Sequence, residues 1–297
     1  MRIGFDIGGT KTEICVLSSS GDLIWNHRIS TPKRYEDFVT AILELVNLAE
    51  QHHGQADAIG LGLPGAISPA TGLIKNANCA FLNGRDLQHD LTSQLGRAVN
   101  LANDANCFAL SEAIDGAGKD APVVFGAILG TGCGGGLVIH QQLLVGPNAV
   151  CGEWGHNPLP GYHEPQDGPA RACYCGRHNC IESYISGTGL QHSYQLKTGQ
   201  TLSAEQIIQA YEQAQPAAVD CYHQLIDHMA RSFAALVNIL DPDVIVLGGG
   251  LSNVRQLYRD LPDATARYVF SDTAQVRFAQ AKYGDSSGIR GAAWLGL

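Results

Sequence analysis

Two stretches of the sequence decide the fold: "RIGFDIGGTKTEICVL" at residues 2–17 and "VVFGAILGTGCGGGLVI" at residues 123–139. Each begins with a short apolar run, passes through a glycine-rich turn and ends in a second apolar run, which is the pattern of a β-hairpin. Because the same pattern occurs twice, the sequence indicates an internal duplication.

The remaining segments alternate between strand and helix patterns. The segment 36–52 places apolar residues on one helical face, and the runs at 58–64 and 244–250 have the composition of buried strands. This alternation predicts an α/β fold of two related domains. The Gly/Asp/Lys-rich stretch at 115–122 is the best candidate for a boundary. We expect one domain formed by residues 1–117 and 283–297 and a second formed by residues 118–282.

Composition excludes several classes of protein. The chain has 297 residues and a formal net charge of -9, which argues against a general nucleic-acid or anionic-membrane binder. No apolar run approaches the roughly 18 residues of a membrane span, and the N-terminus does not have the pattern of a signal peptide. Six of the nine cysteines are scattered at apolar positions, which is typical of buried thiols in a reducing compartment. We therefore expect a cytoplasmic protein.

Two glycine motifs resemble nucleotide-binding signatures without meeting their requirements. "GLGLPG" at 60–65 and "GTGCGG" at 130–135 match the dinucleotide pattern G-x-G-x-x-G, but neither is followed by the helix that would receive a pyrophosphate. "GGTKT" at 8–12 is not a Walker A loop, because its lysine does not directly follow the last glycine.

The two hairpin turns are better candidates for phosphate binding. Glycine lacks Cβ, so the backbone N–H groups of such a turn can approach phosphate oxygens closely. Asp6 precedes the first turn and would hold Mg²⁺ through water, while Thr10 and Lys11 on that turn would reach phosphate. Gly130-Thr131-Gly132 is the corresponding turn of the second domain. The alternative is a pair of tight hairpins that bind nothing.

Six motifs occur in a fixed order along the chain: "DIGGTK" at 6–11, "NDAN" at 103–106, "GTGCGGG" at 130–136, "GEWGH" at 152–156, "CYCGRHNCIE" at 173–182 and "VIVLGGG" at 244–250. Together they resemble the ROK family (repressor, open reading frame, kinase) over essentially the whole chain. The resemblance implies an actin-like, hexokinase-like ATPase fold with a cleft between two α/β domains. "SPATGLIKNAN" at 68–78 and "GEWGHNPLP" at 152–160 are most similar to bacterial fructokinases (manno-fructokinases), and N-acetylglucosamine kinases are the nearest relatives.

The resemblance implies an ATP- and Mg²⁺-dependent hexose 6-phosphotransferase, with D-fructose as the expected substrate and mannose also accepted. An N-acetylglucosamine kinase or another ROK hexokinase is the alternative. A sugar-responsive repressor of the same family is disfavoured, because no helix-turn-helix pattern precedes "DIGGTK". We expect a homodimer with a hexose substrate and neither nucleic-acid nor membrane partners.

The family motifs assign roles to individual residues. Asp104 is the expected general base, although a helix N-cap role is also compatible with "NDAN". The expected sugar-binding residues are Gly65, Asn78, Asn103, Asp104, Glu153, His156 and Glu182. The expected nucleotide-binding residues are Asp6, Gly8, Gly9, Thr10, Lys11, Gly130, Thr131, Gly132, Gly134, Gly248 and Gly249.

The stretch "CYCGRHNC" at 173–180 packs three cysteines into eight positions. In the family, a histidine completes this set, which implies a structural Zn²⁺ held by His156, Cys173, Cys175 and Cys180. A disulfide or three inert thiols are the alternatives. The second ring nitrogen of His156 would bind a sugar hydroxyl, and Glu182 follows Cys180 closely, so we expect zinc to position both side chains. ATP binding should depend less on zinc, because the glycine turns lie elsewhere in the sequence.

Overall fold

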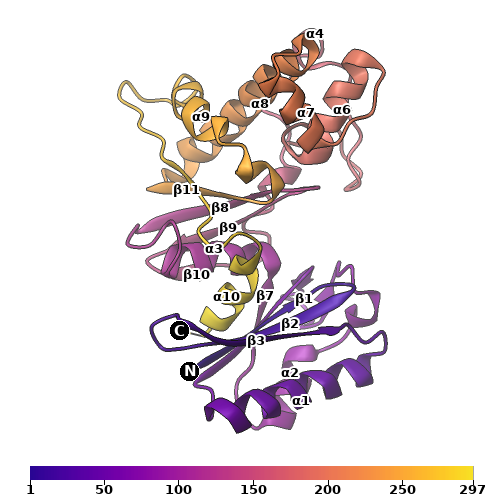
Figure 1. The fold of residues 1–297 in the computed structure, drawn as a ribbon, viewed down its shortest axis with the longest axis vertical. Coiled ribbons are helices and arrows are strands. Elements are labelled where there is room, and N and C mark those ends of the chain that lie inside the picture. Colours follow the sequence, from indigo (N-terminus) through magenta and orange to yellow (C-terminus); the bar gives the residue numbers. More distant parts are fainter. Residues whose placement is uncertain (297) are drawn as a thin grey trace. The chain divides into compact units, whose positions relative to one another are not determined.

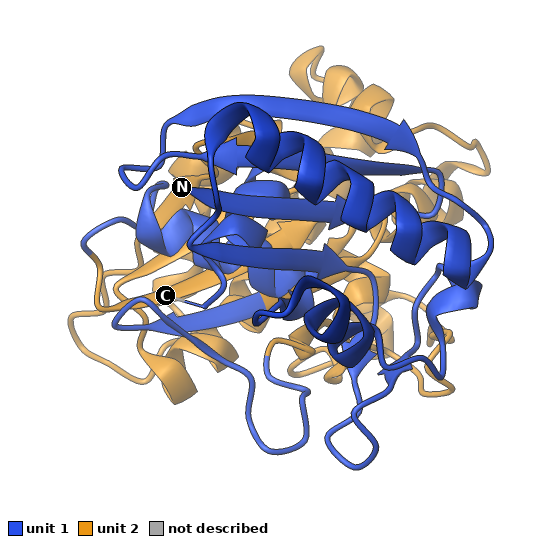
Figure 2. Ribbon diagram, turned by 90° about the horizontal axis from the view of Figure 1, so that it is seen from below, with its two compact units in different colours: residues 1–120, 136–151, 285–297 blue, residues 121–135, 152–284 orange. Residues whose placement is uncertain are grey.

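The computed structural model describes residues 1–296, which form two compact units. Unit 1 comprises residues 1–120, 136–151 and 285–297, and unit 2 comprises residues 121–135 and 152–284 (Figure 2). Residues 136–151 lie in unit 1, whereas the sequence placed them in the second domain. The difference arises because one strand of the second hairpin runs across the division. Among the described residues, no helix is long and apolar enough to cross a membrane.

The chain alternates strands and helices throughout (Figure 1). The strands are β1 (Arg2–Ile7), β2 (Lys11–Leu17), β3 (Leu23–Ser30), β4 (Ala58–Leu63), β5 (Ala66–Ile67), β6 (Ile74–Lys75), β7 (Asn100–Asn103), β8 (Val123–Leu129), β9 (Cys133–Ile139), β10 (Gln142–Leu144), β11 (Val244–Gly248) and β12 (Phe278–Gln280). The α-helices are α1 (Tyr35–His53), α2 (Leu87–Leu95), α3 (Asp104–Ile114), α4 (Glu164–Asp167), α5 (Glu182–Ile185), α6 (Gly187–Thr198), α7 (Ala204–Glu212), α8 (Pro216–Leu240), α9 (Gln256–Ala266) and α10 (Ser287–Trp294). Short 3₁₀ turns are η1 (Ala80–Leu82), η2 (Trp154–His156), η3 (Gly250–Asn253) and η4 (Gly284–Ser286).

The first sheet has the strand order β3-β2-β1-β4-β7. Strands β1, β2 and β3 pair antiparallel, whereas β1, β4 and β7 pair parallel. Alternation along β1 separates the two faces, because successive side chains of a strand point to opposite sides. Ile3 and Phe5 join the apolar core that contains Phe38 of α1, as the helical pattern of 36–52 predicts.

The other face of this sheet packs against α10. A Cβ at Gly4 or Gly60 would overlap the backbone of α10, so glycine is required for this close approach. Figure 1 shows α10 on one side of the first sheet and α1 and α2 on the other. Asp6 shares the α10 face with Gly4, two residues earlier on β1.

The second sheet has the strand order β10-β9-β8-β11-β12, which repeats the topology of the first. Its central pairs β8–β11 and β11–β12 are parallel, and β9–β10 is antiparallel, as in the corresponding pairs of the first sheet. The duplication expected from the two hairpins is therefore confirmed, and so is the α/β fold.

Candidate functional site

In unit 1, the carboxyl ends of three parallel strands bring several of the predicted residues to one edge. The register pairs Asp6 of β1 with Gly62 of β4, and Leu63 with Asn103 of β7. Parallel strands end at the same edge of a sheet, which is where ligands bind in open α/β folds. Asn103 Nδ2 donates to the carbonyl of Gly65 at 3.0 Å, so the residues following β4 and β7 are fastened together.

Gly65 and Asn78 are positioned by the hairpin β5–β6 and the chain that follows it. Gly65 has φ +108°, and a Cβ there would lie 2.6 Å from the carbonyl oxygen of Lys75, so another residue type would be strained. Asn78 comes one residue after Ala77, whose backbone also adjoins Gly65, and its side chain is exposed. The two residues thus belong to one neighbourhood beside Asn103.

Asp104 begins α3, directly after the N-cap Asn103. Both residues cap the helix, since Asn103 Oδ1 and Asp104 Oδ1 accept from the N–H of Ala105 at 2.9 Å and 2.8 Å. The positive end of the helix dipole favours an ionised Asp104. The capping role and the expected role as a proton acceptor are therefore compatible.

Asp6 lies within electrostatic range of Asp104. Burial, followed by the neighbouring Asp104 carboxylate, raises the pKa of Asp6 to about 6. Two carboxylates so close together repel each other, and a divalent cation bound by oxygen ligands would relieve that repulsion. The pair therefore fits the Mg²⁺ site expected at Asp6.

The first glycine turn joins β1 to β2. Gly8 N donates to the carbonyl of Lys11 at 2.9 Å, which closes the hairpin. A Cβ at Gly9 would meet no atom of the chain within 4 Å, and the side chain of Lys11 is exposed. The turn therefore presents backbone, rather than bulky side chains, to its surroundings.

The second glycine turn joins β8 to β9 and is held at two sides. Gly130 N donates to the carbonyl of Gly132 at 3.1 Å, and Gly187 N donates to the carbonyl of Gly130 at 2.7 Å. Gly249 follows β11 with φ +77°, and a Cβ there would lie 2.7 Å from the carbonyl oxygen of Leu129. The parallel pairing of β8 with β11 thus places Gly248 and Gly249 beside this turn, as the predicted nucleotide site requires.

Gly134 is the second residue of β9, just after the second glycine turn. Its carbonyl accepts from Trp154 Nε1 at 3.0 Å. Trp154 packs between Phe125 and Phe233 and anchors η2, which carries Glu153 just before it and His156 at its end. Glu153 is exposed. The carbonyl of Gly134 therefore supports η2, which carries the two predicted sugar-binding residues, and the expected role of Gly134 in nucleotide binding stays a prediction.

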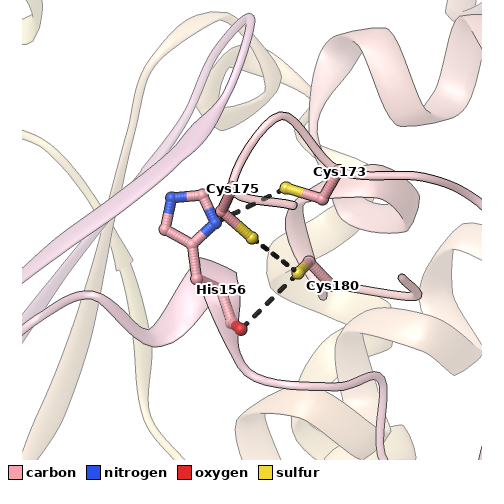
Figure 3. A group of neighbouring side chains, drawn as sticks. All are labelled: His156, Cys173, Cys175 and Cys180. Atoms are coloured by element: carbon pink, nitrogen blue, oxygen red, sulfur yellow. Dashed lines mark hydrogen bonds between the residues drawn. The ribbon is translucent and has the colours of Figure 1, made fainter. Parts of the chain in front are cut away.

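The four predicted metal ligands converge (Figure 3). The ligand atoms of His156, Cys173, Cys175 and Cys180 all lie within 4.8 Å of one another. His156 Nδ1 is 3.6 Å from Cys173 Sγ, and Cys175 Sγ is 3.6 Å from Cys180 Sγ. Tetrahedral zinc with bonds of about 2.3 Å to sulfur would separate such atoms by about 3.5–3.8 Å, so the donor set and its spacing fit the metal.

Hydrogen bonds hold the loop at residues 171–180, which carries the three cysteines and is called the metal loop for its candidate ligands, in place. Asn179 N donates to the carbonyl of Arg171, and Asn179 Oδ1 accepts from Arg171 N, both at 2.8 Å. A hydrogen bond with the backbone of Arg177 lowers the pKa of Cys175 to about 7. An acidic thiol favours the thiolate that binds metal. All nine cysteines are free thiols, so no disulfide competes for the loop.

The second ring nitrogen of His156 has a partner that the sequence did not suggest. His156 Nε2 lies 2.9 Å from the hydroxyl of Tyr174, a side chain that is 83% exposed. A sugar hydroxyl could use Nε2 only after displacing that hydroxyl, and an exposed tyrosine can rotate away. The spacing of the ligands gave no signal for this contact.

Glu182 connects the metal loop with the second glycine turn. Its Oε2 accepts from Cys133 N at 2.9 Å, and its Oε1 is 4.0 Å from Cys173 Sγ. A Cβ at Gly132 would lie 2.6 Å from Glu182 Oε2. We expected ATP binding to depend less on zinc because the glycine turns are distant from the cysteines in sequence. The contact of Glu182 with the second glycine turn connects that turn to the metal loop, and the sequence did not indicate it.

The family model of the ROK family matches residues 2–297. An N-acetyl-D-glucosamine kinase from Pasteurella multocida is 41% identical over 303 aligned residues that cover 100% of this chain and 99% of the relative. Among solved structures, a ROK hexokinase from Thermus thermophilus superposes with a TM-score of 0.86 at 30% identity, covering 99% and 96% of the two chains. A ROK glucokinase from Streptomyces griseus, solved with glucose and AMPPNP, gives a TM-score of 0.74 at 28% identity and covers 98% and 97%.

The chain therefore belongs to the ROK family and has its actin-like, hexokinase-like ATPase fold. The match extends over the full length of both partners, so it includes both glycine turns and the metal loop.

Proposed function

We propose that the protein transfers the γ-phosphoryl group of ATP to the 6-hydroxyl of N-acetyl-D-glucosamine. The observation that carries the kinase assignment is the position of Asp104 beside Asp6, at the carboxyl ends of β1 and β7. The choice of sugar is supported by the relatives named N-acetyl-D-glucosamine kinase, which are 40–41% identical over the whole chain. They favour the alternative over fructose, which the sequence motifs led us to expect.

In the proposed reaction, the sugar 6-oxygen forms a bond to the γ-phosphorus while the bond to the ADP oxygen breaks. Asp104 accepts the proton of the 6-hydroxyl. A carboxylate at a helix N-terminus is a weak base, but in a loose transition state the proton can leave late, so a weak base suffices. Mg²⁺ near Asp6 would supply charge neutralisation for the phosphates.

The remaining predicted residues orient the two substrates. Sugar hydroxyls would be bound by the expected residues Asn78, Asn103, Glu153, His156 and Glu182 and by the backbone of Gly65. The segment 66–82, with the hairpin β5–β6, is where we expect recognition of the substituent at sugar carbon 2. The two glycine turns would bind the phosphates through backbone N–H groups.

We also infer that His156, Cys173, Cys175 and Cys180 hold one Zn²⁺. Four protein ligands leave no open position, so the metal would be structural. Its contribution would be to fix the ring of His156 and the start of α5, where Glu182 lies.

A screen of ATP-dependent phosphorylation tests the proposal, with N-acetylglucosamine, N-acetylmannosamine, fructose, mannose and glucose as acceptors. We expect kcat/KM for N-acetylglucosamine to exceed that for fructose by at least about tenfold, a margin that pocket contacts readily supply. A preference for fructose would restore the expectation from the motifs and overturn the choice of sugar. Failure to phosphorylate any of the five would overturn the kinase assignment.

A further inference from the structure

Behind the first glycine turn, two threonine hydroxyls form a chain of hydrogen bonds. Thr31 Oγ1 donates to the carbonyl of Gly8 at 2.8 Å. A carbonyl can only accept, so Thr31 uses its one hydrogen there, and Thr12 Oγ1, 3.0 Å away, must donate to Thr31. Lys33 Nζ donates to the next carbonyl, that of Gly9. Two successive carbonyls of the turn are thus held by the residues just after β3.

Behind the second glycine turn, the same arrangement is built from unrelated sequence. Thr188 Oγ1 donates to the carbonyl of Thr131 at 2.6 Å, and Ser186 Oγ, 2.9 Å from Thr188, must donate to it in turn. Ser186 Oγ itself accepts from Gly189 N at 3.0 Å, so the direction of the chain is fixed. Gly187 N donates to the carbonyl of Gly130. The two successive carbonyls of Gly130 and Thr131 thus accept hydrogen bonds from residues at the start of α6.

The held carbonyls determine where the neighbouring N–H groups point. In a trans peptide the C=O and the N–H of the following residue point in opposite directions. The N–H groups opposed to the held carbonyls belong to Gly9 and Thr10 in the first turn, and to Thr131 and Gly132 in the second. Within residues 1–296, none of these four N–H groups donates a hydrogen bond. Each turn therefore presents two successive unpaired N–H groups, which is the arrangement of an anion-binding nest.

We propose that Thr31 and Thr188 are positioning residues for the ATP phosphates. Each hydroxyl holds one carbonyl of its glycine turn, and so aims a pair of N–H groups at phosphate oxygen. Neither threonine contacts the nucleotide, and each acts through the turn in its own unit. The proposal rests on the kinase function proposed above, because it takes the anion to be the phosphates of ATP.

The test compares valine with serine at each position. Thr31→Val and Thr188→Val keep the side-chain shape and remove the hydroxyl, whereas Thr31→Ser and Thr188→Ser keep the hydroxyl. Isothermal titration with AMPPNP and Mg²⁺ should show about three- to tenfold weaker binding for each valine variant, the scale of one net hydrogen bond. Each serine variant should stay within about twofold of the wild type.

Matched controls separate positioning from general stability. Thr40 and Thr198 donate to carbonyls four residues earlier in α1 and α6, away from the turns. Thr40→Val and Thr198→Val should leave AMPPNP affinity unchanged, and affinity for N-acetylglucosamine should be unchanged in every variant. Thr31 is buried, so Thr31→Val is measured at low temperature, whereas Thr188 is exposed and its variants should fold.

The outcomes distinguish this proposal from the proposed function. Wild-type affinity for AMPPNP in the Thr188→Val protein, or an equal loss in the valine and serine variants, would overturn the positioning role. If Thr31→Val does not fold, the Thr188 pair decides the proposal. A wild-type protein that binds no AMPPNP would instead overturn the kinase function.

Discussion

Units 1 and 2 contain the same sheet and the same kind of glycine turn, yet only one carries an acidic residue before the turn. Aligning Gly8 with Gly130 places Ile128 where unit 1 has Asp6, and the pairings Asp6–Gly62 and Ile128–Gly248 are equivalent. After the outer parallel strand, unit 1 continues with Asp104, whereas β12 is followed by Ala281 and Lys282.

The difference separates the glycine turn, which the duplicated fold itself builds, from the carboxylates, which it does not require. A turn that presents two N–H groups is preserved in both units, because the hairpin and the residues behind it are sufficient to build it. Carboxylates at the positions of Asp6 and Asp104 are found in unit 1, and the equivalent positions of unit 2 carry none. Unit 2 has instead the candidate metal cluster, in which the cysteine loop converges with His156 of η2. Glu182, two residues after Cys180, accepts a hydrogen bond from Cys133 N beside the second glycine turn. In the function proposed above, the same scaffold would serve proton transfer in unit 1 and positioning in unit 2.

The largest expected effect comes from Asp104, whose equivalent position in unit 2 carries no carboxylate. Asp104→Asn preserves the shape and a cap for α3, but it removes the proton acceptor, so kcat should fall by about a hundredfold or more. Sugar affinity should fall much less, since the other contacts remain. Steady-state kinetics and direct binding would measure both quantities. Asp37→Asn on the exposed face of α1 is the control. Near-normal turnover in folded Asp104→Asn would contradict the role of Asp104 as proton acceptor.

A smaller effect should distinguish the two glycine turns. In Gly132→Ala the new Cβ would lie 2.6 Å from Glu182 Oε2, so Glu182 or the turn must shift, and kcat/KM should fall by about tenfold while Tm also decreases. In Gly9→Ala the Cβ meets no atom of the chain within 4 Å, so Tm should not change. Thermal melting of both variants checks this. Equal losses of Tm would contradict the inference that only the second turn packs against a side chain, that of Glu182.

The smallest effect concerns a buried group of unit 2. His228 Nε2 lies 3.0 Å from Asp167 Oδ1, and burial lowers the pKa of His228 to about 4. The unfolded state takes up this proton below about pH 6.5, while the folded state does so only near pH 4. The unfolded state therefore binds more protons between these values, and stability should fall as pH decreases from 6.5 to 4. His228→Gln should lose less stability over that window, as chemical denaturation would measure, and an identical loss would contradict the assignment.

Much of the fold could be predicted because it depends on local patterns. The period of apolar residues in 36–52 predicted α1. The five residues on the predicted apolar face are all buried, namely Phe38, Ile42, Leu45, Val46 and Ala49. The two strand–turn–strand stretches predicted the duplication. The division of residues 136–151 could not be predicted, because β9 is one continuous strand and its sequence contains no break where the units divide.

Parts of the site could not be predicted, because they depend on contacts between distant segments. Thr31 reaches Gly8 only through the register of β2 with β3, and Thr188 reaches Thr131 across 57 residues of sequence. The cysteine spacing led to the metal cluster, but it gave no indication that Tyr174 would contact His156. Threonine and tyrosine are common surface residues, so their presence alone does not identify them.

We infer that the metal loop of unit 2 positions both the proposed sugar-binding residues, His156 and Glu182, and the second glycine turn. The most direct test is to measure zinc content and then titrate N-acetylglucosamine and AMPPNP into the wild type and Cys175→Ala, with Cys151→Ala as a control outside the cluster. The wild type should contain about one zinc per chain, and Cys175→Ala should lose most of it, because three remaining ligands bind far more weakly. The affinities for sugar and nucleotide should then both weaken, on the order of tenfold or more, because Glu182 and His156 are no longer fixed. A zinc-free variant that melts earlier yet binds both ligands normally at low temperature would contradict the account.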